Sequence, residues 1–204
     1  MNFVGNAIDL GTTISSEDFE AWMCPQPSAP SFPFPADRLI KFHSTIPDYE
    51  IYTPTTRDEN NNPCIMVIKR GYGSGLTVGR LNTIRSIIRS YFKNKPGKAS
   101  YEVSVLRRNS QSGPFAARGD SGSVAVDGKG RVAGLITAGT PRCTYLTSVN
   151  FLLKRMSKHG LEADLSPSLD ASLVSMARTL ICFICSLPIR LIYRLLSVLL
   201  DYCL

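Results

Sequence analysis

One short run of residues has the composition that surrounds a reactive serine. It is RGDSGSVAV, residues 118–126, in which Ser121 follows an aspartate and precedes a glycine. The nearby Gly119 and Gly122 allow the tight backbone turn from which a serine can project without crowding a substrate. A serine hydroxyl is a weak nucleophile and needs a base beside it. The run therefore predicts a nucleophile whose base must be found elsewhere in the chain.

The chain has two histidines, His43 and His159, and the pattern around each argues against a role as that base. His43 lies in LIKFHSTIPDYE, among charged residues after a proline-rich stretch, as a surface or linker histidine would. His159 ends the helical pattern FLLKRMSKHG, where a cation suits the negative end of the helix dipole. We therefore expect neither histidine to activate the serine.

The segments around Ser121 have the pattern of short β-strands. CIMVIKRG and SGLTVGRL flank a glycine-rich corner at residues 71–75, and SVAVDGKGRVAGLITAG turns back at residues 127–130, so both patterns predict hairpins. YEVSVL and CTYLTSV predict two further strands, and a helix that stops at Gly160 follows them. Because the glycine-rich corner joins two strands and leads into no helix, it does not fit a phosphate-binding loop.

The first part of the chain shows no comparable run of strands. ISSEDFEAWM predicts one short helix, with a serine as its cap and acidic residues in its first turn. Residues 25–37 contain five prolines, which favour an extended linker over a helix or a central strand. We expect three regions: residues 1–55 with a residual strand, this helix and the linker; a β-domain at 56–165; and a tail at 166–204.

Three segments resemble trypsin-like serine proteases. GDSGS, followed about a dozen residues later by VAGLITAG, is similar to the nucleophile region of that family. IKRGYGSGLTVGRL and TYLTSVNFLLKRM resemble, in the same order, a strand–turn–strand segment of its fungal members and the final strand and helix. The resemblance covers about residues 60–160, the second of the family's two β-barrels. It implies an all-β fold with one six-stranded antiparallel barrel and a C-terminal helix.

The resemblance also implies roles for the residues of the motif. Ser121 would be the nucleophile, and the backbone amides of Gly119 and Ser121 would form an oxyanion hole. Asp120 would pair with a buried cation or amine and so support the loop. In the digestive enzymes that amine is made by activation cleavage, and we expect no such amine in this chain.

The same resemblance points to a substrate pocket. Phe115 stands where trypsin-type enzymes carry an aspartate at the base of the pocket, so no preference for basic substrates is implied. Thr137, Ala138 and Gly139 would form the opposite wall, and their small side chains would leave the pocket open. The expected ligand is a peptide or protein, and the bond that it would offer for cleavage is not indicated.

The catalytic histidine and aspartate of this family precede the serine and belong to the first barrel. Only about 25 residues precede the proline-rich linker, and NAIDLG resembles the last part of such a barrel. Two interpretations stay open. The chain is a trypsin-like serine endopeptidase in a truncated or inactive form, or it is a non-catalytic pseudo-protease that binds a partner. Whether it is an enzyme is therefore undecided at this point.

Composition excludes several other classes of function. Hydrophobic residues make up 44% and charged residues 19% of the chain, which is typical of a folded domain. The net charge of +7 could attract anions, but no zinc-finger spacing or aromatic–basic interleaving indicates nucleic-acid binding. Cys182 and Cys185 form an isolated pair within an apolar run, so we predict no metal site and no cofactor. MNFVGNAIDLG lacks the features of a secretory signal, so we expect a cytoplasmic protein.

The last 34 residues mix apolar and basic side chains. Their longest uncharged stretch runs for eleven residues, from Thr179 to Ile189, whereas a membrane-spanning helix needs about 20. Arginines between leucines, isoleucines and phenylalanine suit a helix that lies on a membrane surface. A helix that packs on a protein partner is the alternative. We therefore expect residues 173–204 to contact a membrane surface or a protein partner.

Overall fold

The computed structural model of the 204-residue chain describes residues 6–26, 32–92, 95–163 and 165. The described residues belong to one compact unit, which spans Met1–Pro167. The apolar helical tail predicted for residues 166–204 lies outside the described residues.

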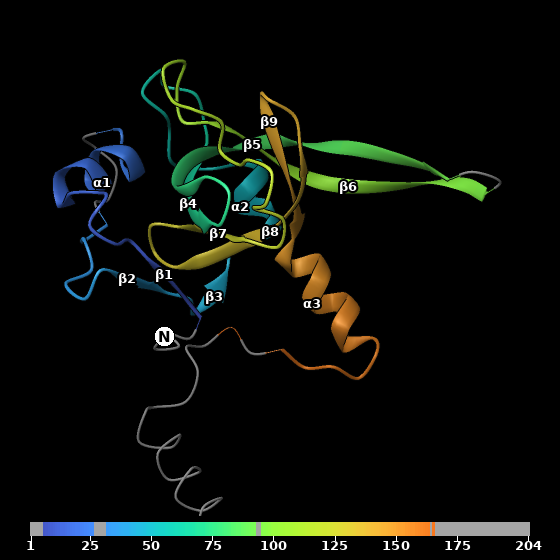
Figure 1. Cartoon of the computed structure of the whole chain (residues 1–204). Helices are drawn as coiled ribbons and strands as arrows, with labels where there is room; N and C mark the ends of the chain where they lie inside the picture. Colours follow the sequence, from blue (N-terminus) through green and yellow to red (C-terminus); the bar gives the residue numbers. More distant parts are fainter. Residues whose placement is uncertain (1–5, 27–31, 93–94, 164, 166–204) are drawn as a thin grey trace, which may run out of the picture. The chain divides into compact units, whose positions relative to one another are not determined.

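The described part of the chain is mostly β-sheet with a few short helices (Figure 1). The strands are β1 (Ala7–Asp9), β2 (Leu39–Lys41), β3 (Ser44–Thr45), β4 (Ile65–Gly71), β5 (Gly75–Phe92), β6 (Lys95–Arg107), β7 (Val124–Asp127), β8 (Arg131–Gly139) and β9 (Cys143–Ser148). The helices are α1 (Ser16–Met23), α2 (Asp48–Tyr52) and α3 (Val149–Ser157).

Seven strands form one sheet, in the order β3-β8-β7-β4-β5-β6-β9. Strand β9 also pairs with β8, so the antiparallel pairings of β4, β5, β6, β9, β8 and β7 close into a cycle. Strand β3 joins β8 as a parallel seventh strand, with Ser44 opposite Arg131, which departs from the six antiparallel strands expected from the sequence. Strands β1 and β2 form a separate antiparallel pair.

The local turns and caps follow the sequence pattern closely. The glycine-rich corner is the β4–β5 hairpin, in which Gly71 lies opposite Gly75, and residues 127–130 connect β7 to β8. The first helix begins after Ser15, whose hydroxyl accepts a hydrogen bond from the amide of Asp18. These predicted elements, together with β9 and α3, are confirmed.

The β5–β6 hairpin is longer than the sequence pattern indicated. We expected strands near 75–81 and at 101–106, whereas β5 extends to Phe92 and β6 begins at Lys95. Figure 1 shows the two strands extending away from the rest of the sheet. The reason is that beyond the core the two strands pair mainly with each other, so their exposed residues lack the alternation of a half-buried strand.

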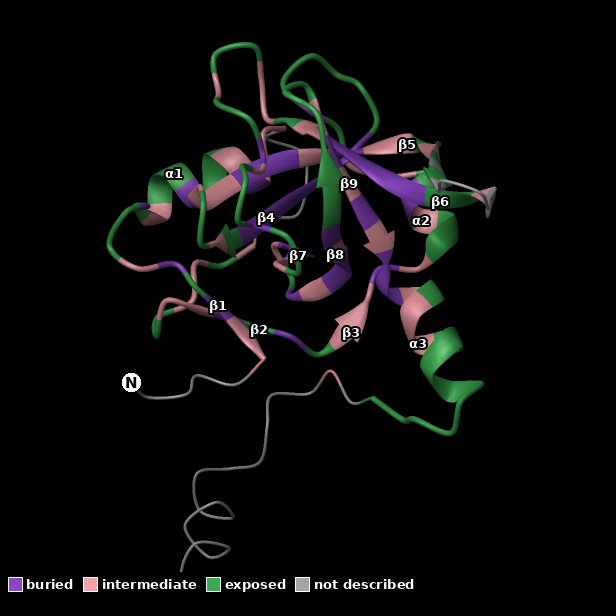
Figure 2. Cartoon of the chain, turned by 45° about the vertical axis from the view of Figure 1, so that its right-hand side comes forward, coloured by how far each residue is buried: buried purple, intermediate pink, exposed green. Residues whose placement is uncertain are grey.

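Two clusters of buried apolar side chains form the core (Figure 2). One cluster receives a side chain from every strand of the closed cycle; these are Val67, Leu81, Val103, Val105, Leu146, Ala133, Ile136 and Ala125, joined by Ile46 and Ile51. The other cluster joins β4 to the N-terminal segment through residues such as Ile68, Leu10 and Phe19.

The described part of the N-terminal segment belongs to the same compact unit as the seven-stranded sheet. Phe19 of α1 is fully buried, and Phe34, from the proline-rich stretch, meets its ring edge-on at 5.5 Å between centroids. Burying each such side chain contributes about 2 kcal/mol. The described residues between 6 and 55, expected from the sequence to be a residual strand, a helix and a linker, therefore contribute to the core of the β-domain.

Candidate functional site

Ser121 lies on the rim of a pocket of about 400 Å³. The pocket is formed by two segments, the one that leads to Ser121 and the end of β8 with the turn that follows it. Its lining residues are Pro114, Ala116, Ala117, Arg118, Ser121, Ile136, Ala138, Gly139, Thr140 and Pro141. The pocket is predominantly apolar, and Ser121 itself is exposed.

The backbone on both sides of Ser121 takes conformations that glycine adopts readily. The φ angle is +100° at Gly119 and +85° at Gly122, in the region that side chains disfavour. The amide of Gly122 donates to the carbonyl of Ile136 at 2.8 Å, and the amide of Ile136 donates to the carbonyl of Ser123 at 2.9 Å. The loop that carries Ser121, residues 117–123, is therefore bonded directly to β8.

Three amides of this loop, here called the nucleophile loop, have no acceptor among the described residues: those of Arg118, Gly119 and Ser121. The amides of Asp120, Gly122 and Ser123 all donate to backbone carbonyls. Within the described residues no hydrogen bond is formed by the amides of Gly119 and Ser121. These are the two amides for which the resemblance implied an oxyanion hole. Backbone amides without an acceptor can donate to a carbonyl oxygen or an oxyanion, and of these two residues Ser121 lines the pocket.

A buried ion pair holds the nucleophile loop. The side chains of Asp120 and Lys69 are both 0% exposed, and the Lys69 Nζ lies 2.8 Å from the Asp120 Oδ2. The amides of Gly73, Ser74 and Ala117 also donate to the Asp120 carboxylate. Asp120 therefore ties its loop to the β4–β5 hairpin.

The surroundings of Asp120 favour its charged form. Burial alone would raise the pKa of this carboxyl, but hydrogen bonds from Lys69, Ser74 and the backbone outweigh burial and hold the pKa well below its usual range. Burial lowers the pKa of Lys69, and the charge and hydrogen bond of Asp120 counter that effect. Each charge would be costly to bury alone, so the two depend on each other.

Lys69 was not identified as a site residue from the sequence. The available signal was a lysine in the otherwise apolar segment IMVIKRG, directly before the glycine-rich corner. A lysine at such a position is rarely fully buried unless it is paired. The buried cation expected for Asp120 is thus the side chain of Lys69 on β4.

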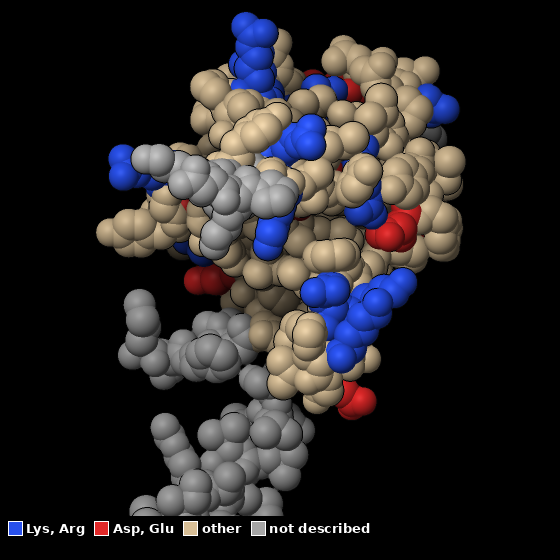
Figure 3. Space-filling model, turned by 90° about the vertical axis from the view of Figure 1, so that its right-hand side faces the viewer, with Lys and Arg blue, Asp and Glu red and all other residues tan. Residues whose placement is uncertain are grey.

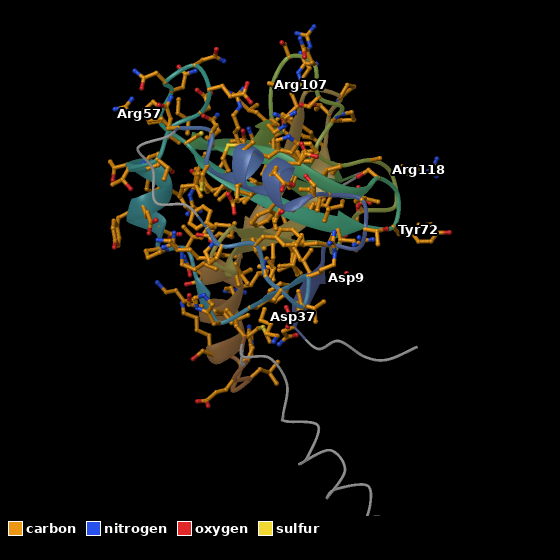
Figure 4. The ribbon with its side chains drawn as sticks, turned by 90° about the vertical axis from the view of Figure 1, so that its left-hand side faces the viewer. Asp9, Asp37, Arg57, Tyr72, Arg107 and Arg118 are labelled. Atoms are coloured by element: carbon orange, nitrogen blue, oxygen red, sulfur yellow. The ribbon has the colours of Figure 1, made fainter. Side chains whose placement is uncertain are left out.

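The glycines of the β4–β5 corner permit its contact with the nucleophile loop. A Cβ atom on Gly71 would collide with the Asp120 carboxylate, and one on Gly73 would collide with the carbonyl oxygen of Arg118. Figure 4 shows Tyr72 and Arg118 projecting outward near each other from these two turns. The glycine-rich corner therefore permits close packing against the nucleophile loop.

The residues expected to form the pocket occupy three kinds of position. Ala138 and Gly139 line it. Phe115 is 2% exposed and lies in the core beside Gly79 and Val105, while its neighbours Pro114 and Ala116 face the pocket. Thr137 is not among the lining residues, and its hydroxyl donates to the carbonyl of Tyr145 at 3.3 Å.

Both histidines are bound or exposed away from Ser121. The His43 Nε2 lies 2.6 Å from the carbonyl oxygen of Lys129, and its Nδ1 lies 2.9 Å from the Ser44 hydroxyl. Lys129 follows β7, whereas Ser121 precedes that strand. His159 is exposed after the end of α3. Within the described residues no side chain forms a hydrogen bond with the Ser121 hydroxyl.

No protein-family model matches the chain, and no curated protein is significantly similar to it. In the part of the chain that the structure describes, no group of three or more His, Cys, Asp or Glu side chains could hold a metal ion. None of the helices in that part has the length and apolar character needed to cross a membrane.

Proposed function

We propose that the chain carries the nucleophile half of a trypsin-like serine endopeptidase, with Ser121 as the attacking residue. One observation carries this proposal. Ser121 lies at a pocket beside two free amides, on a loop that a buried ion pair fixes in place. The order of the three segments that resemble the family supports the same function.

The strand pairings support the corresponding fold. We propose that β4–β9 form a six-stranded antiparallel barrel of the trypsin-like type, with β3 added outside it. The support is the closed cycle of antiparallel pairings and the apolar cluster to which all six strands contribute. In such a barrel the nucleophile loop and the end of β8 would bound the substrate pocket.

The proposed reaction uses each part of the site. The Ser121 Oγ attacks the peptide carbonyl carbon while a base takes its proton, and the carbonyl oxygen becomes an oxyanion. The amides of Gly119 and Ser121 donate to that oxyanion as its charge develops. The protonated base then gives its proton to the leaving amine, and water hydrolyses the resulting ester.

The pocket indicates the class of substrate side chain. No carboxylate is among its lining residues, and the one charged residue there, Arg118, is a cation. Burying a lysine or arginine of the substrate in an apolar pocket without an anionic partner would be unfavourable. We therefore propose that the pocket accepts an uncharged apolar side chain.

A second candidate function is a non-catalytic peptide-binding module. It is favoured by the position of His43 and His159, because a serine without a base stays a neutral alcohol. The same pocket and amides would then bind a peptide carbonyl without cleaving the chain. The catalytic function requires a base that another segment or another chain supplies.

A fluorophosphonate probe separates the two candidates, because it labels only an activated serine. We expect the 204-residue chain to show no labelling above its Ser121→Ala variant. We expect labelling at Ser121 once a longer chain supplies a histidine and an aspartate upstream. His43→Ala serves as the matched control and should leave labelling of the longer chain unchanged. Absence of labelling in every longer chain that folds would overturn the catalytic proposal and favour the binding module.

A further inference from the structure

The outer part of the β5–β6 hairpin forms a separate two-stranded arm. Strand β4 pairs with β5 only up to Leu81, and β9 pairs with β6 only from Val103 onward. The arm, defined as residues 82–92 and 95–102, therefore pairs only with itself within the described residues. It extends beyond the rest of the sheet, as Figure 1 shows.

The arm concentrates positive charge. Between residues 82 and 101 the sequence contains five basic residues, Arg85, Arg89, Lys93, Lys95 and Lys98, and no acidic residue. Arg85, at the base of the arm, is paired with Asp48 of α2 at 3.1 Å, so the charge available to a partner comes from the basic residues farther out. Glu102, where the arm meets the sheet, is buried. In Figure 3, which faces this end of the molecule, Lys and Arg side chains are more widespread than Asp and Glu.

One face of the arm exposes large apolar side chains. Ile87 and Tyr101 lie opposite each other on the two strands, and each is 65% exposed. Tyr91, which is 78% exposed, lies on the same face of β5 because side chains alternate along a strand. Arg89 lies between Ile87 and Tyr91 on that face, with its guanidinium 5.7 Å from the centre of the Tyr91 ring.

We propose that this face of the arm docks on an anionic membrane surface. Ile87, Tyr91 and Tyr101 would enter the boundary between lipid headgroups and acyl chains, where the phenol hydroxyls remain hydrated. Arg89 would bind the phosphate and carboxylate groups of the lipids while its aliphatic stem stays at the apolar boundary. The exposed Lys98 lies opposite Ser90, on the other face of the two-stranded arm, and adds positive charge within the range over which the lipid charges attract it.

Two other partners fit the arm less well. Two copies of this chain would place cationic arms against each other, and like charges disfavour that contact. A nucleic acid could stack bases on the tyrosines, but it would gain nothing comparable from Ile87 or from Ile84, which is 71% exposed. The mixture of aliphatic, phenolic and basic side chains is the one that a lipid interface binds.

The free edges of the arm limit how deep it can enter. Residues 82–92 of β5 and 95–102 of β6 each have one edge without a neighbouring strand. Backbone groups at such edges need water or headgroup partners, because hydrocarbon offers none. The arm would therefore lie in the headgroup region and would not span the bilayer.

Sedimentation of the full chain with vesicles tests the proposal. The vesicles contain phosphatidylcholine alone or with phosphatidylserine, and the variants are Arg89→Glu with Lys98→Glu, and Ile87→Ser with Tyr101→Ser. We expect the charge-reversed variant to lose at least about tenfold in affinity for the anionic vesicles, since each basic residue near the surface contributes about fivefold. The variant Ile87→Ser with Tyr101→Ser should also lose at least about tenfold, because it removes apolar area that would enter the lipid boundary. Binding to neutral vesicles should be weak for every form.

The matched control changes the same number of charges elsewhere. Lys154→Glu with Lys158→Glu alters two exposed lysines at the end of α3, and it should bind anionic vesicles like the unmodified chain. All forms retain the same tail, so differences between them report on the arm. Their unfolding midpoints should agree, because the substituted side chains are exposed.

A second measurement locates the arm directly. In the variant Tyr91→Trp, vesicles with brominated acyl chains should quench the added indole emission, whereas the emission of Trp22 in the unmodified chain should stay unchanged. Equal vesicle binding of the arm variants and the unmodified chain would overturn the proposal, and so would an equal loss in the α3 control. Tighter binding to a single-stranded oligonucleotide than to anionic vesicles would also overturn it.

Discussion

The segments at the two ends of strand β7 each contain a buried aspartate, but the two carboxylates accept hydrogen bonds from different parts of the chain. At the far end, Asp127 accepts from the amides of Lys129 and Arg131 in its own turn, and the amide of Gly130 donates to the Asp127 carbonyl. At the near end, the Asp120 carboxylate accepts from Gly73 and Ser74 on a different hairpin, while the amides of Gly119 and Ser121 have no acceptor among the described residues.

The two carboxylates therefore differ in where their amide donors come from. The turn at Asp127 is bonded to itself through the amides of Lys129, Gly130 and Arg131, and among the described residues only its Gly128 amide lacks an acceptor. Asp120 accepts from Ala117 in its own loop and also from the β4–β5 hairpin, so its loop is bonded to another part of the sheet. The cations that pair with the two aspartates also differ in exposure. Lys69 is fully buried, whereas Arg131 is 18% exposed and is shared between Asp127 and Glu50.

Removing the buried cation should have the largest effect. We expect Lys69→Met to lower the free energy of unfolding by about 3–5 kcal/mol, because it leaves the Asp120 charge buried and unpaired. Urea unfolding measures this change. Arg131→Met is the matched control, and it should cost less, because Arg131 and its partner Glu50 are both partly exposed and their charges are screened by water. Equal losses of stability in the two variants would show that the two ion pairs do not differ in their dependence on burial.

Lowering the pH should remove the stability that the Lys69–Asp120 pair contributes. The pKa of Asp120 is lower in the folded protein than its usual value, so its carboxylate stabilises the fold at neutral pH and that stability is lost as the pH falls below about 4. The double variant Lys69→Met with Asp120→Leu should lose about 2 kcal/mol less than the unmodified chain between neutral and acidic pH. Urea unfolding at a series of pH values checks this, and unchanged pH dependence in the double variant would count against it.

Two glycines with nearly equal φ angles, one in each of these two segments, should differ in the stability lost on substitution by alanine. Gly130, with φ +84°, lies against the Lys41 carbonyl oxygen, with which an added Cβ would collide. Gly122, with φ +85°, has open space around its Cβ position. We expect Gly130→Ala to cost about 2–3 kcal/mol from strain and collision, and Gly122→Ala only about 1 kcal/mol from strain. Thermal unfolding of both variants measures this difference, and the reverse order would refute it.

The elements that depend on neighbouring residues were predictable. The cap at Ser15, the glycine-rich corner and the turn at residues 127–130 are confirmed, because short-range backbone geometry and hydrogen bonding decide them. The motif around Ser121 was also recognisable from the sequence, since its glycines must meet a local conformational demand. The free amides beside it follow from that same local backbone.

Other features depended on contacts between distant parts of the chain. The pairing of Lys69 with Asp120 joins residues far apart in the sequence, and the burial of Phe115 beside Gly79 is decided by how two strands pack. The packing of Phe19 on β4 likewise needs the folded domain as its partner. The turns, the first helix and the glycine positions around Ser121 could be predicted without the fold, because their interactions span only a few residues. The identity of the buried cation, the side chains that line the pocket and the point at which the arm leaves the sheet could not, because each depends on burial against residues that are remote in the chain.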